Sequence, residues 1–306
     1  MPVEIGIPPV VPVLYVVLFT ARGAPPSEAA LREQVEAWVR RRVEAPLREH
    51  LLEWCGRDKA RLELHPSEQI VLPARSVLVS TGLGVEEAAR LDAATHAVVV
   101  GTVDALHPPR PGLWWAIAAA RALASHLGGV IYDPEVRTVF PVDVRNDPLP
   151  PDGAIDLREH LRVFTNPMRN GWWMTSHGLA RFGLPDLELC EVPGEVLFEA
   201  MGLVHRAAGV LHGRARVLAR KGGAVRMKLT SLTLPWNGLE ASTIGLSFAP
   251  FPGKAQPFLR LHPPGADGSH HRRAQRVRRG AGVLSAGRAG PPRPHGPRPG
   301  FPAAAG

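Results

Sequence analysis

The sequence predicts an α/β fold: an α+β sandwich with a ferredoxin-like N-terminal half, a smaller α+β second domain and a disordered C-terminal tail. Three observations predict it. Two apolar segments without alternation, Val13–Thr20 and Ala97–Val103, each precede a helical pattern. Short β-rich segments surround a further long helical pattern after residue 151. Beyond residue 261, proline and glycine replace the periodic hydrophobicity.

The first strand and helix unit starts at Val13–Thr20, whose continuous apolar character predicts a strand buried on both faces. Ser27 is placed to cap the helix that follows over 27–43. One face of that helix carries Leu31, Val35, Trp38, Val39 and Val43. Pro46 either kinks this helix or starts a second one that ends near Gly56.

The second unit repeats this order. Ala97–Val103 predicts a second buried strand, and Leu113–Leu127 predicts a helix that ends at Gly128. Short strands are expected over Val130–Tyr132 and Arg137–Phe140. We expect the two long strands to lie side by side in one sheet with both long helices on it, because a strand without alternation needs cover on two faces.

Shorter elements are expected around these units. Between them, the pattern predicts strands over Arg61–Leu64, Gln69–Leu72 and Ser76–Val79, and a helix over Val85–Leu91. Proline and polar residues over 145–151 mark a boundary between domains at 1–145 and 152–261. The second domain is expected to hold a helix near 156–161, a strand over 187–190, a helix over 195–211, a hairpin pairing 214–218 with 225–234, and a last strand over 243–248.

Residues 262–306 are expected to form a disordered basic tail, since these 45 residues include eight prolines and nine glycines. They also hold eight arginines, which supply most of the formal net charge of +8. A functional basic arm and out-of-frame translation of GC-rich DNA are the two explanations. The second fits better, because all of the basic charge is arginine and no aromatic residue interleaves the arginines as a stacking surface requires.

The cysteine content and the N-terminus predict a compartment. The two cysteines, Cys55 and Cys190, lie far apart and in no metal-ligand spacing, which indicates reduced thiols in the cytoplasm. The apolar stretch Ile7–Thr20 follows Glu4 and no basic residue, and prolines interrupt it, so we do not expect a secretion signal. No run reaches the roughly 20 apolar residues of a membrane span. We therefore expect a cytoplasmic protein without a membrane partner.

The polar chemistry of the chain is concentrated in the segment Thr175–Leu189, which we call the motif segment. It holds a hydroxyl pair, an imidazole, a guanidinium and two carboxylates between two glycines and a proline. Its part His177–Glu188, HGLARFGLPDLE, follows a tryptophan pair and resembles the HGLxRFGLP(D/E)LE segment of an uncharacterised bacterial protein family, a domain of unknown function. The resemblance is closer over 172–193 than over 96–140. It implies a bacterial protein and no particular activity.

Two interpretations of the motif segment remain open. Ser176 and His177 suggest a nucleophile and a base, with Asp186 or Glu188 as the orienting acid. Adjacent residues seldom face each other, however, and no G-x-S-x-G elbow exposes the serine. The structural interpretation is that His177 and Arg181 form hydrogen bonds to Asp186 or Glu188 and hold a glycine-rich bend.

A polar binding site is the third possibility at this segment. It would comprise His177, Arg181, Glu188 and Trp173, because loops on a rigid scaffold are common places for sites. The aromatic residue would line the cleft.

Cofactor and metal sites are not expected. Thr81–Gly84 with Asp104 imitates a dinucleotide fingerprint, but Glu87 replaces the third glycine, so a tight turn is the better interpretation. His205 and His212 share one side of a helix about 10 Å apart, which is too far for one metal ion.

The leading hypothesis is therefore a non-catalytic binding or interaction module whose partner is an unidentified protein or small molecule. The first alternative is a hydrolase or ligand-dependent enzyme built on His177, Arg181, Asp186 and Glu188. The second alternative is nucleic-acid binding through the basic tail, provided that the tail is genuine.

Overall fold

The structure is a computed structural model that describes residues 3–57, 59–106, 108–140, 147–220, 225–229, 231–235, 243–250 and 258–262. These ranges lie in one unit, Met1–Pro263. The tail that the sequence predicts over 262–306 falls outside the described residues, apart from His262 at the end of a strand.

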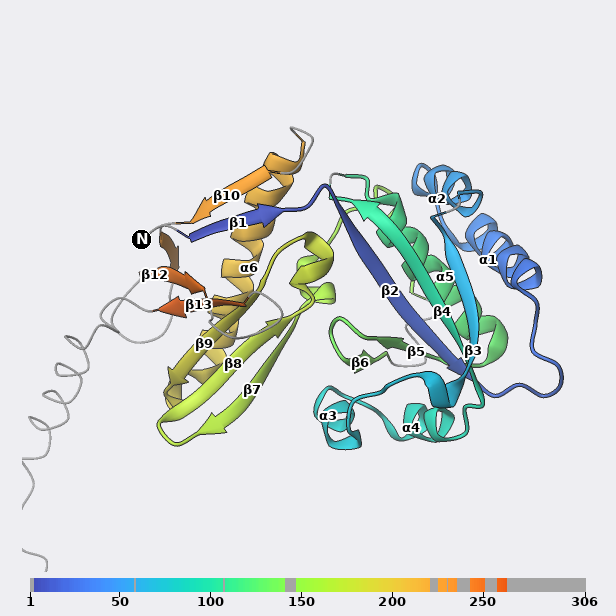
Figure 1. Cartoon of the computed structure of the whole chain (residues 1–306), viewed down its shortest axis with the longest axis horizontal. Helices are drawn as coiled ribbons and strands as arrows, with labels where there is room; N and C mark the ends of the chain where they lie inside the picture. Colours follow the sequence, from blue (N-terminus) through green and yellow to red (C-terminus); the bar gives the residue numbers. More distant parts are fainter. Residues whose placement is uncertain are drawn as a thin grey trace, which may run out of the picture. The chain divides into compact units, whose positions relative to one another are not determined.

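A five-stranded sheet organises the N-terminal half (Figure 1). Its order is β3-β4-β2-β5-β6, and every neighbouring pair is antiparallel. The strands are β2 (Val10–Phe19), β3 (Arg61–Pro66), β4 (His96–Ala105), β5 (Val130–Asp133) and β6 (Thr138–Val139). Helices separate β2 from β3 and β4 from β5. The order of the first four strands and their directions are those of the ferredoxin-like β-α-β-β-α-β arrangement, so the predicted fold class is confirmed.

The two long strands lie side by side in the centre of this sheet, as expected, with Val17 opposite Val98. On one face lie α1 (Glu28–Arg42), α2 (Leu47–Cys55) and α5 (Pro111–Leu127), and α5 contacts both β2 and β4. On the other, α3 (Arg75–Ser80) and α4 (Val85–Asp92) bury Leu78 and Leu91 against Val16 and Leu18 of β2. This cover on both faces explains why the end of β2 shows no alternation.

Local signals place several helix ends where the sequence predicts them. The Ser27 side chain accepts a hydrogen bond from the Ala30 backbone N–H at 3.3 Å and caps α1. α2 begins directly after Pro46. Gly128 ends α5 in the left-handed region, with φ at +66°.

The second sheet lies in the C-terminal half and has the order β11-β12-β13-β9-β8-β7 (Figure 1). Its strands are β7 (Arg162–Met168), β8 (Gly171–His177), β9 (Asp186–Val192), β11 (Ser231–Pro235), β12 (Thr243–Pro250) and β13 (Phe258–His262). The pair β13–β9 is parallel and the other pairs are antiparallel. The long helix α6 (Leu197–Ala219) packs on this sheet, which gives the predicted smaller α+β part.

Short 3-10 turns connect these elements: η1 (Ser67–Gln69), η3 (Leu157–His160), η4 (Leu179–Phe182) and η5 (Gly194–Val196). The helix expected near 156–161 is η3, and the Asp156 side chain caps it by accepting from the Arg158 backbone N–H at 2.9 Å. Among the described residues, no helix is both long and apolar enough to span a membrane.

The hairpin expected between 214–218 and 225–234 is wrong. Residues 214–218 continue α6, because Ala215 extends the buried stripe that Leu211 carries one turn earlier. The strand β10 (Val225–Leu229) pairs instead with β1 (Val3–Ile7), at the opposite end of the described chain. A pairing between such distant segments leaves no local signal.

The strands expected over 69–72 and 76–79 are also wrong. The first range follows η1 without forming a strand, and the second lies in α3. Short apolar runs do not distinguish a strand from a helix by periodicity, and here only Leu78 of α3 is buried. The strand β13 was not expected, although it provides the parallel neighbour of β9.

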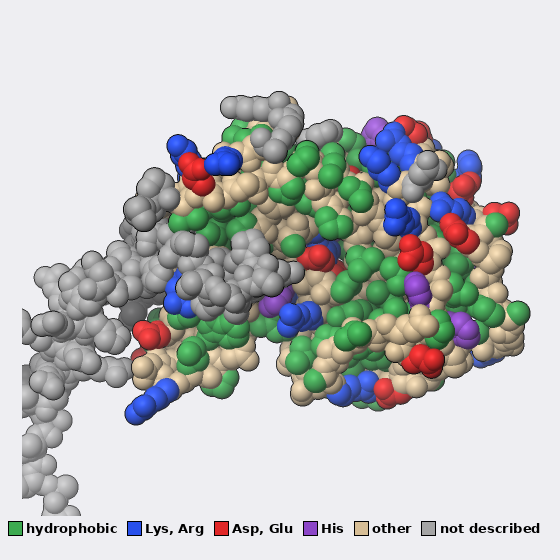
Figure 2. Space-filling model, viewed as in Figure 1, with side chains coloured by type: hydrophobic (Ala, Val, Ile, Leu, Met, Phe, Trp, Pro, Cys, Tyr) green, Lys and Arg blue, Asp and Glu red, His purple; other side chains and the backbone are tan. Residues whose placement is uncertain are grey.

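Charge is evenly mixed over the visible face of the N-terminal half, where basic and acidic side chains alternate over the helices and strands on the right of Figure 2. This agrees with the sequence, in which basic and acidic residues nearly balance before residue 261. Because the charges nearly balance, an excess of one sign in the described part is confined to a small area of the surface.

Candidate functional site

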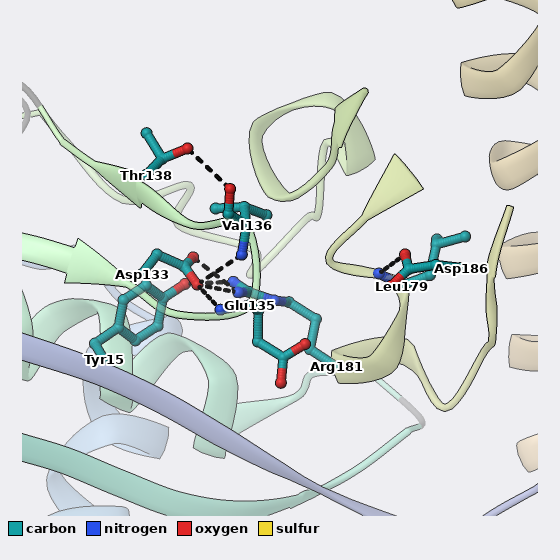
Figure 3. A network of polar contacts seen from close by, with 8 residues as sticks. All are labelled: Tyr15, Asp133, Glu135, Val136, Thr138, Leu179, Arg181 and Asp186. Carbon is teal, nitrogen blue, oxygen red and sulfur yellow. Dashed lines mark hydrogen bonds and ion pairs between the residues drawn. The ribbon is translucent and has the colours of Figure 1, made fainter. Parts of the chain in front are cut away.

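The guanidinium of Arg181, in the middle of the motif segment, connects the two halves of the molecule (Figure 3). Its Nη2 donates to both carboxylate oxygens of Asp133 at 2.6 and 2.8 Å, and its Nη1 donates to the Tyr15 hydroxyl at 2.7 Å. Tyr15 belongs to β2 and Asp133 ends β5, whereas Arg181 lies in η4. The side chains of Arg181 and Asp133 are each 1% exposed. We call Tyr15, Asp133 and Arg181 the clasp.

A second buried ion pair adjoins the clasp. The Nε of Arg110 donates to Asp104 Oδ2 at 2.8 Å, and its Nη2 donates to the backbone carbonyl of Arg181 at 2.9 Å. Asp104 also accepts from the backbone N–H groups of Gly112 and Leu113, the first-turn donors of α5. The motif segment is thus held at Arg181 both through the side chain of this residue and through its backbone carbonyl.

The electrostatics of the clasp favour a charged arginine and a neutral tyrosine. Burial opposes the charge on Arg181, but Asp133 and the Tyr15 oxygen outweigh it and raise the pKa of the guanidinium. Burial also raises the pKa of Tyr15. Both groups therefore keep one protonation state through the physiological range, as a fixed structural contact requires.

The bend of the motif segment is closed by Asp186. Its Oδ1 accepts from the Ser176 hydroxyl at 3.0 Å. The same oxygen accepts from the Leu179 backbone N–H at 3.2 Å, a contact drawn in Figure 3. The Ser176 oxygen in turn accepts from the Leu187 backbone N–H at 2.8 Å. Burial raises the pKa of Asp186 to about 7. Ser176 is wholly buried, so its hydroxyl serves the bend.

His177 and Ser176 are not brought together. They are consecutive residues of β8, so their side chains point to opposite faces of the sheet. The His177 ring packs edge-on against Phe164, with centroids 4.9 Å apart, and its Nε2 lies 3.5 Å from the Thr175 hydroxyl. Of the three candidate catalytic residues, only Ser176 and Asp186 touch.

The four candidate binding residues lie in different surroundings. Trp173 donates through Nε1 to Glu188 Oε1, and Arg260 of β13 lies 3.5 Å from the same oxygen. Glu188 is only 2% exposed. Arg181 is part of the clasp, and His177 lies against Phe164, so the structure pairs Trp173 with Glu188 and separates the other two.

His160, which the sequence analysis did not single out, lies beside the second ion pair. Its ring packs edge-on against Trp114 and Phe182, and its Nε2 is buried without a hydrogen-bond partner among the described residues. Burial, and then the positive charge of Arg181, lower the pKa of His160 to about 3. The adjoining cavity measures about 60 Å³ and is too small for an ordinary ligand site.

A sequence signal exists for the buried acids of the clasp and of the second ion pair. Asp104 and Asp133 each stand near the end of an apolar strand, and a carboxylate that ends a buried strand needs a cation or a helix N-terminus nearby. The signal identifies the acids but not their partners, because Asp133 and Arg181 are 48 residues apart.

A groove near the motif segment is formed by η3, the start of β7 and α6, and has a volume of about 740 Å³. Its charged and titratable lining residues are Asp156, Arg158, Arg162, His205 and Arg206. Arg162 stands directly opposite His177 in the β7–β8 pair. We call this the arginine groove.

The segment that imitates a dinucleotide fingerprint lies between two helices. Thr81–Gly84 links α3 to α4, so the strand that a dinucleotide fingerprint needs before its glycines is a helix here. Within the described ranges, no group of three or more potential metal-ligating side chains comes together.

Comparison with known proteins gave no match to a family model, to a curated protein or to a solved structure.

Proposed function

We propose that this chain is a non-catalytic binding module, in which the motif segment fixes the two sheets to each other and the arginine groove takes the ligand. The observation that carries the proposal is the burial of Arg181. A guanidinium that is 1% exposed and bound to Asp133 and Tyr15 contributes to the framework, which leaves ligand binding to the more accessible groove beside it.

The remaining polar groups of the motif segment support the same function. Ser176 is buried and both donates to Asp186 and accepts from the backbone. Glu188 is engaged by Trp173 and Arg260. A nucleophile, a base and an orienting acid in one accessible cleft would favour the hydrolase alternative, and the described residues of this segment supply no such set. The free thiols Cys55 and Cys190 are consistent with a cytoplasmic protein, which we include in the proposal.

The proposal is tested by blocking the arginine groove. A Cβ added at Gly209, which lines the groove, meets no atom within 4 Å, and the same holds for Gly213, one turn farther along α6. Gly213 lines a different depression. Gly209→Trp should therefore fill the groove without disturbing α6, and Gly213→Trp is the matched control.

The measurement is ligand-observed NMR with a library of small neutral and charged fragments on the full-length chain. We expect a subset of fragments to bind the wild type and the Gly213→Trp variant, and to lose binding to Gly209→Trp. A library without binders, or binders that are indifferent to Gly209→Trp, contradicts the proposal.

The hydrolase alternative has its own test. Release of p-nitrophenol from simple ester and phosphate substrates should equal the uncatalysed rate with wild type and with His177→Ala. Turnover that is present in wild type and lost in both Ser176→Ala and His177→Ala would overturn the non-catalytic assignment.

A further inference from the structure

Cationic side chains outnumber anionic ones in the lining of the arginine groove. It contains three guanidinium groups, those of Arg158, Arg162 and Arg206, and one carboxylate, Asp156. Among the described residues, none of these three arginines forms an ion pair with a carboxylate. Asp156 instead accepts from the Arg158 backbone N–H as the cap of η3. The groove therefore carries an uncompensated charge close to +2.

His205 lies within reach of the charges that line the groove. Burial, followed by the positive charges of Arg158 and Arg162, lowers the pKa of His205, whereas Asp156 opposes them. The imidazole is thus neutral at physiological pH and adds a hydrogen-bonding group to the groove without adding charge.

The guanidinium of Arg206 lies beside Gly202, which has no side chain to displace it. A Cβ at Gly202 would lie 3.2 Å from Arg206 Nη1, which shows that the guanidinium extends along α6 over Gly202. The Arg206 Nε is buried and has no hydrogen-bond partner among the described residues. A buried N–H of a charged group without an acceptor is costly unless a ligand or solvent supplies one.

The rest of the groove is apolar. Leu161, Val163 and Met201 line it, and Leu161 is almost fully buried. A volume of about 740 Å³ falls in the range of pockets for small organic ligands. The groove thus combines a cationic part with an apolar part.

We infer that the arginine groove binds a phosphate monoester with a compact apolar body, an inference that rests on the proposed function and specifies its ligand. The guanidinium fork matches the oxygens of a phosphate. A phosphate monoester carries close to two negative charges at pH 7, which balances the groove, whereas a monocarboxylate balances only half of it. The apolar lining accommodates the body of the ester.

The experiment is isothermal titration calorimetry of the full-length chain with phenyl phosphate. Phenol, benzoate and inorganic phosphate are the comparison ligands. We expect phenyl phosphate to bind at least 10-fold more tightly than any of the other three. Arg162→Gln and Arg206→Gln should each lower the affinity for phenyl phosphate about 10-fold, which is the loss expected for one charge-assisted hydrogen bond. Arg214→Gln is the control, because Arg214 is exposed on α6 and does not line the groove. Gly209→Trp should abolish binding.

The outcomes separate this inference from the proposed function. If phenol binds as tightly as phenyl phosphate and Gly209→Trp abolishes the binding of both, the inference of an anionic ligand is wrong, whereas the proposed binding function stands. Equal binding of benzoate and phenyl phosphate overturns the dianion specificity. If none of the four ligands binds, this inference fails, and the fragment library alone decides the proposed function. If a ligand binds and Gly209→Trp has no effect on its binding, both proposals fail. Release of phenol from bound phenyl phosphate would overturn the non-catalytic assignment and leave the ligand class intact.

Discussion

Arg181 in the motif segment and Asp133 at the end of β5 form a buried ion pair, in which one guanidinium nitrogen lies within 2.8 Å of both carboxylate oxygens. The pair joins an element of the C-terminal half to the central region of the ferredoxin-like sheet, where Tyr15 provides a third contact. Arg181, one of the four candidate binding residues, is therefore buried in a contact between the two halves. Its position explains why the glycine-rich bend around it has a defined conformation.

Arg181→Met should destabilise the protein by about 3–5 kcal/mol, because it leaves Asp133 as an unpaired buried charge. Urea denaturation measures the change in the free energy of unfolding. The control is Arg169→Met in the exposed turn between β7 and β8, which should change it by less than about 0.5 kcal/mol. Similar costs for both variants would show that the clasp contributes nothing.

Gly178→Ala should destabilise the protein by more than about 2 kcal/mol. Gly178 has φ at +113°, and a Cβ there would meet the His160 carbonyl oxygen. Gly209→Ala in α6 is the matched substitution. Its Cβ meets nothing within 4 Å, so it should stabilise by about 0.5–1 kcal/mol through helix propensity. Equal thermal midpoints for the two variants would contradict the bend geometry.

Asp186→Asn should remove a component of the pH dependence of stability. The folded pKa of Asp186 is about 7, above its ordinary value near 3.8, so the native state retains a proton that the unfolded state has released between these pH values. Stability from this group is therefore fully present below about pH 4 and declines as the pH rises to about 7.

Asparagine keeps the acceptor oxygen for Ser176 and Leu179 but does not titrate. The difference in unfolding free energy, wild type minus Asp186→Asn, should fall between pH 4 and pH 7. Exposed Asp152→Asn serves as the control, and a flat difference for Asp186→Asn would refute the raised pKa.

His160→Gln should act in the opposite direction. The folded pKa of His160 is about 3, below its ordinary value near 6.5, so the unfolded state binds the additional proton between these values. Its contribution is fully present above pH 6.5 and is lost as the pH falls, by up to about 1.4 kcal/mol per pH unit. Removing the imidazole should therefore flatten the acid limb of the stability curve. The exposed His126→Gln control should leave that limb unchanged.

Much of the ferredoxin-like half was predictable because its signals are local. The end of β2 is apolar at every position, and this alone indicates cover on both faces. Ser27 and Gly128 mark helix ends through their own backbone preferences. The candidate site was predicted only in part, since the sequence identified Arg181 but assigned Asp186 or Glu188 as its partner. The structure pairs Arg181 with Asp133 and Tyr15, and leaves Asp186 to the bend.

The sequence by itself determined the elements whose causes lie within one turn or one strand: the central strands, their helices and the glycine-rich bend. Tertiary structure alone decided which side chains meet. The pairing of β1 with β10, the ion pair of Arg181 with Asp133, and the convergence of Arg158, Arg162 and Arg206 on one groove all join segments far apart in the chain. A charge in a sequence has no preferred partner until burial removes its water and leaves one counter-charge within reach.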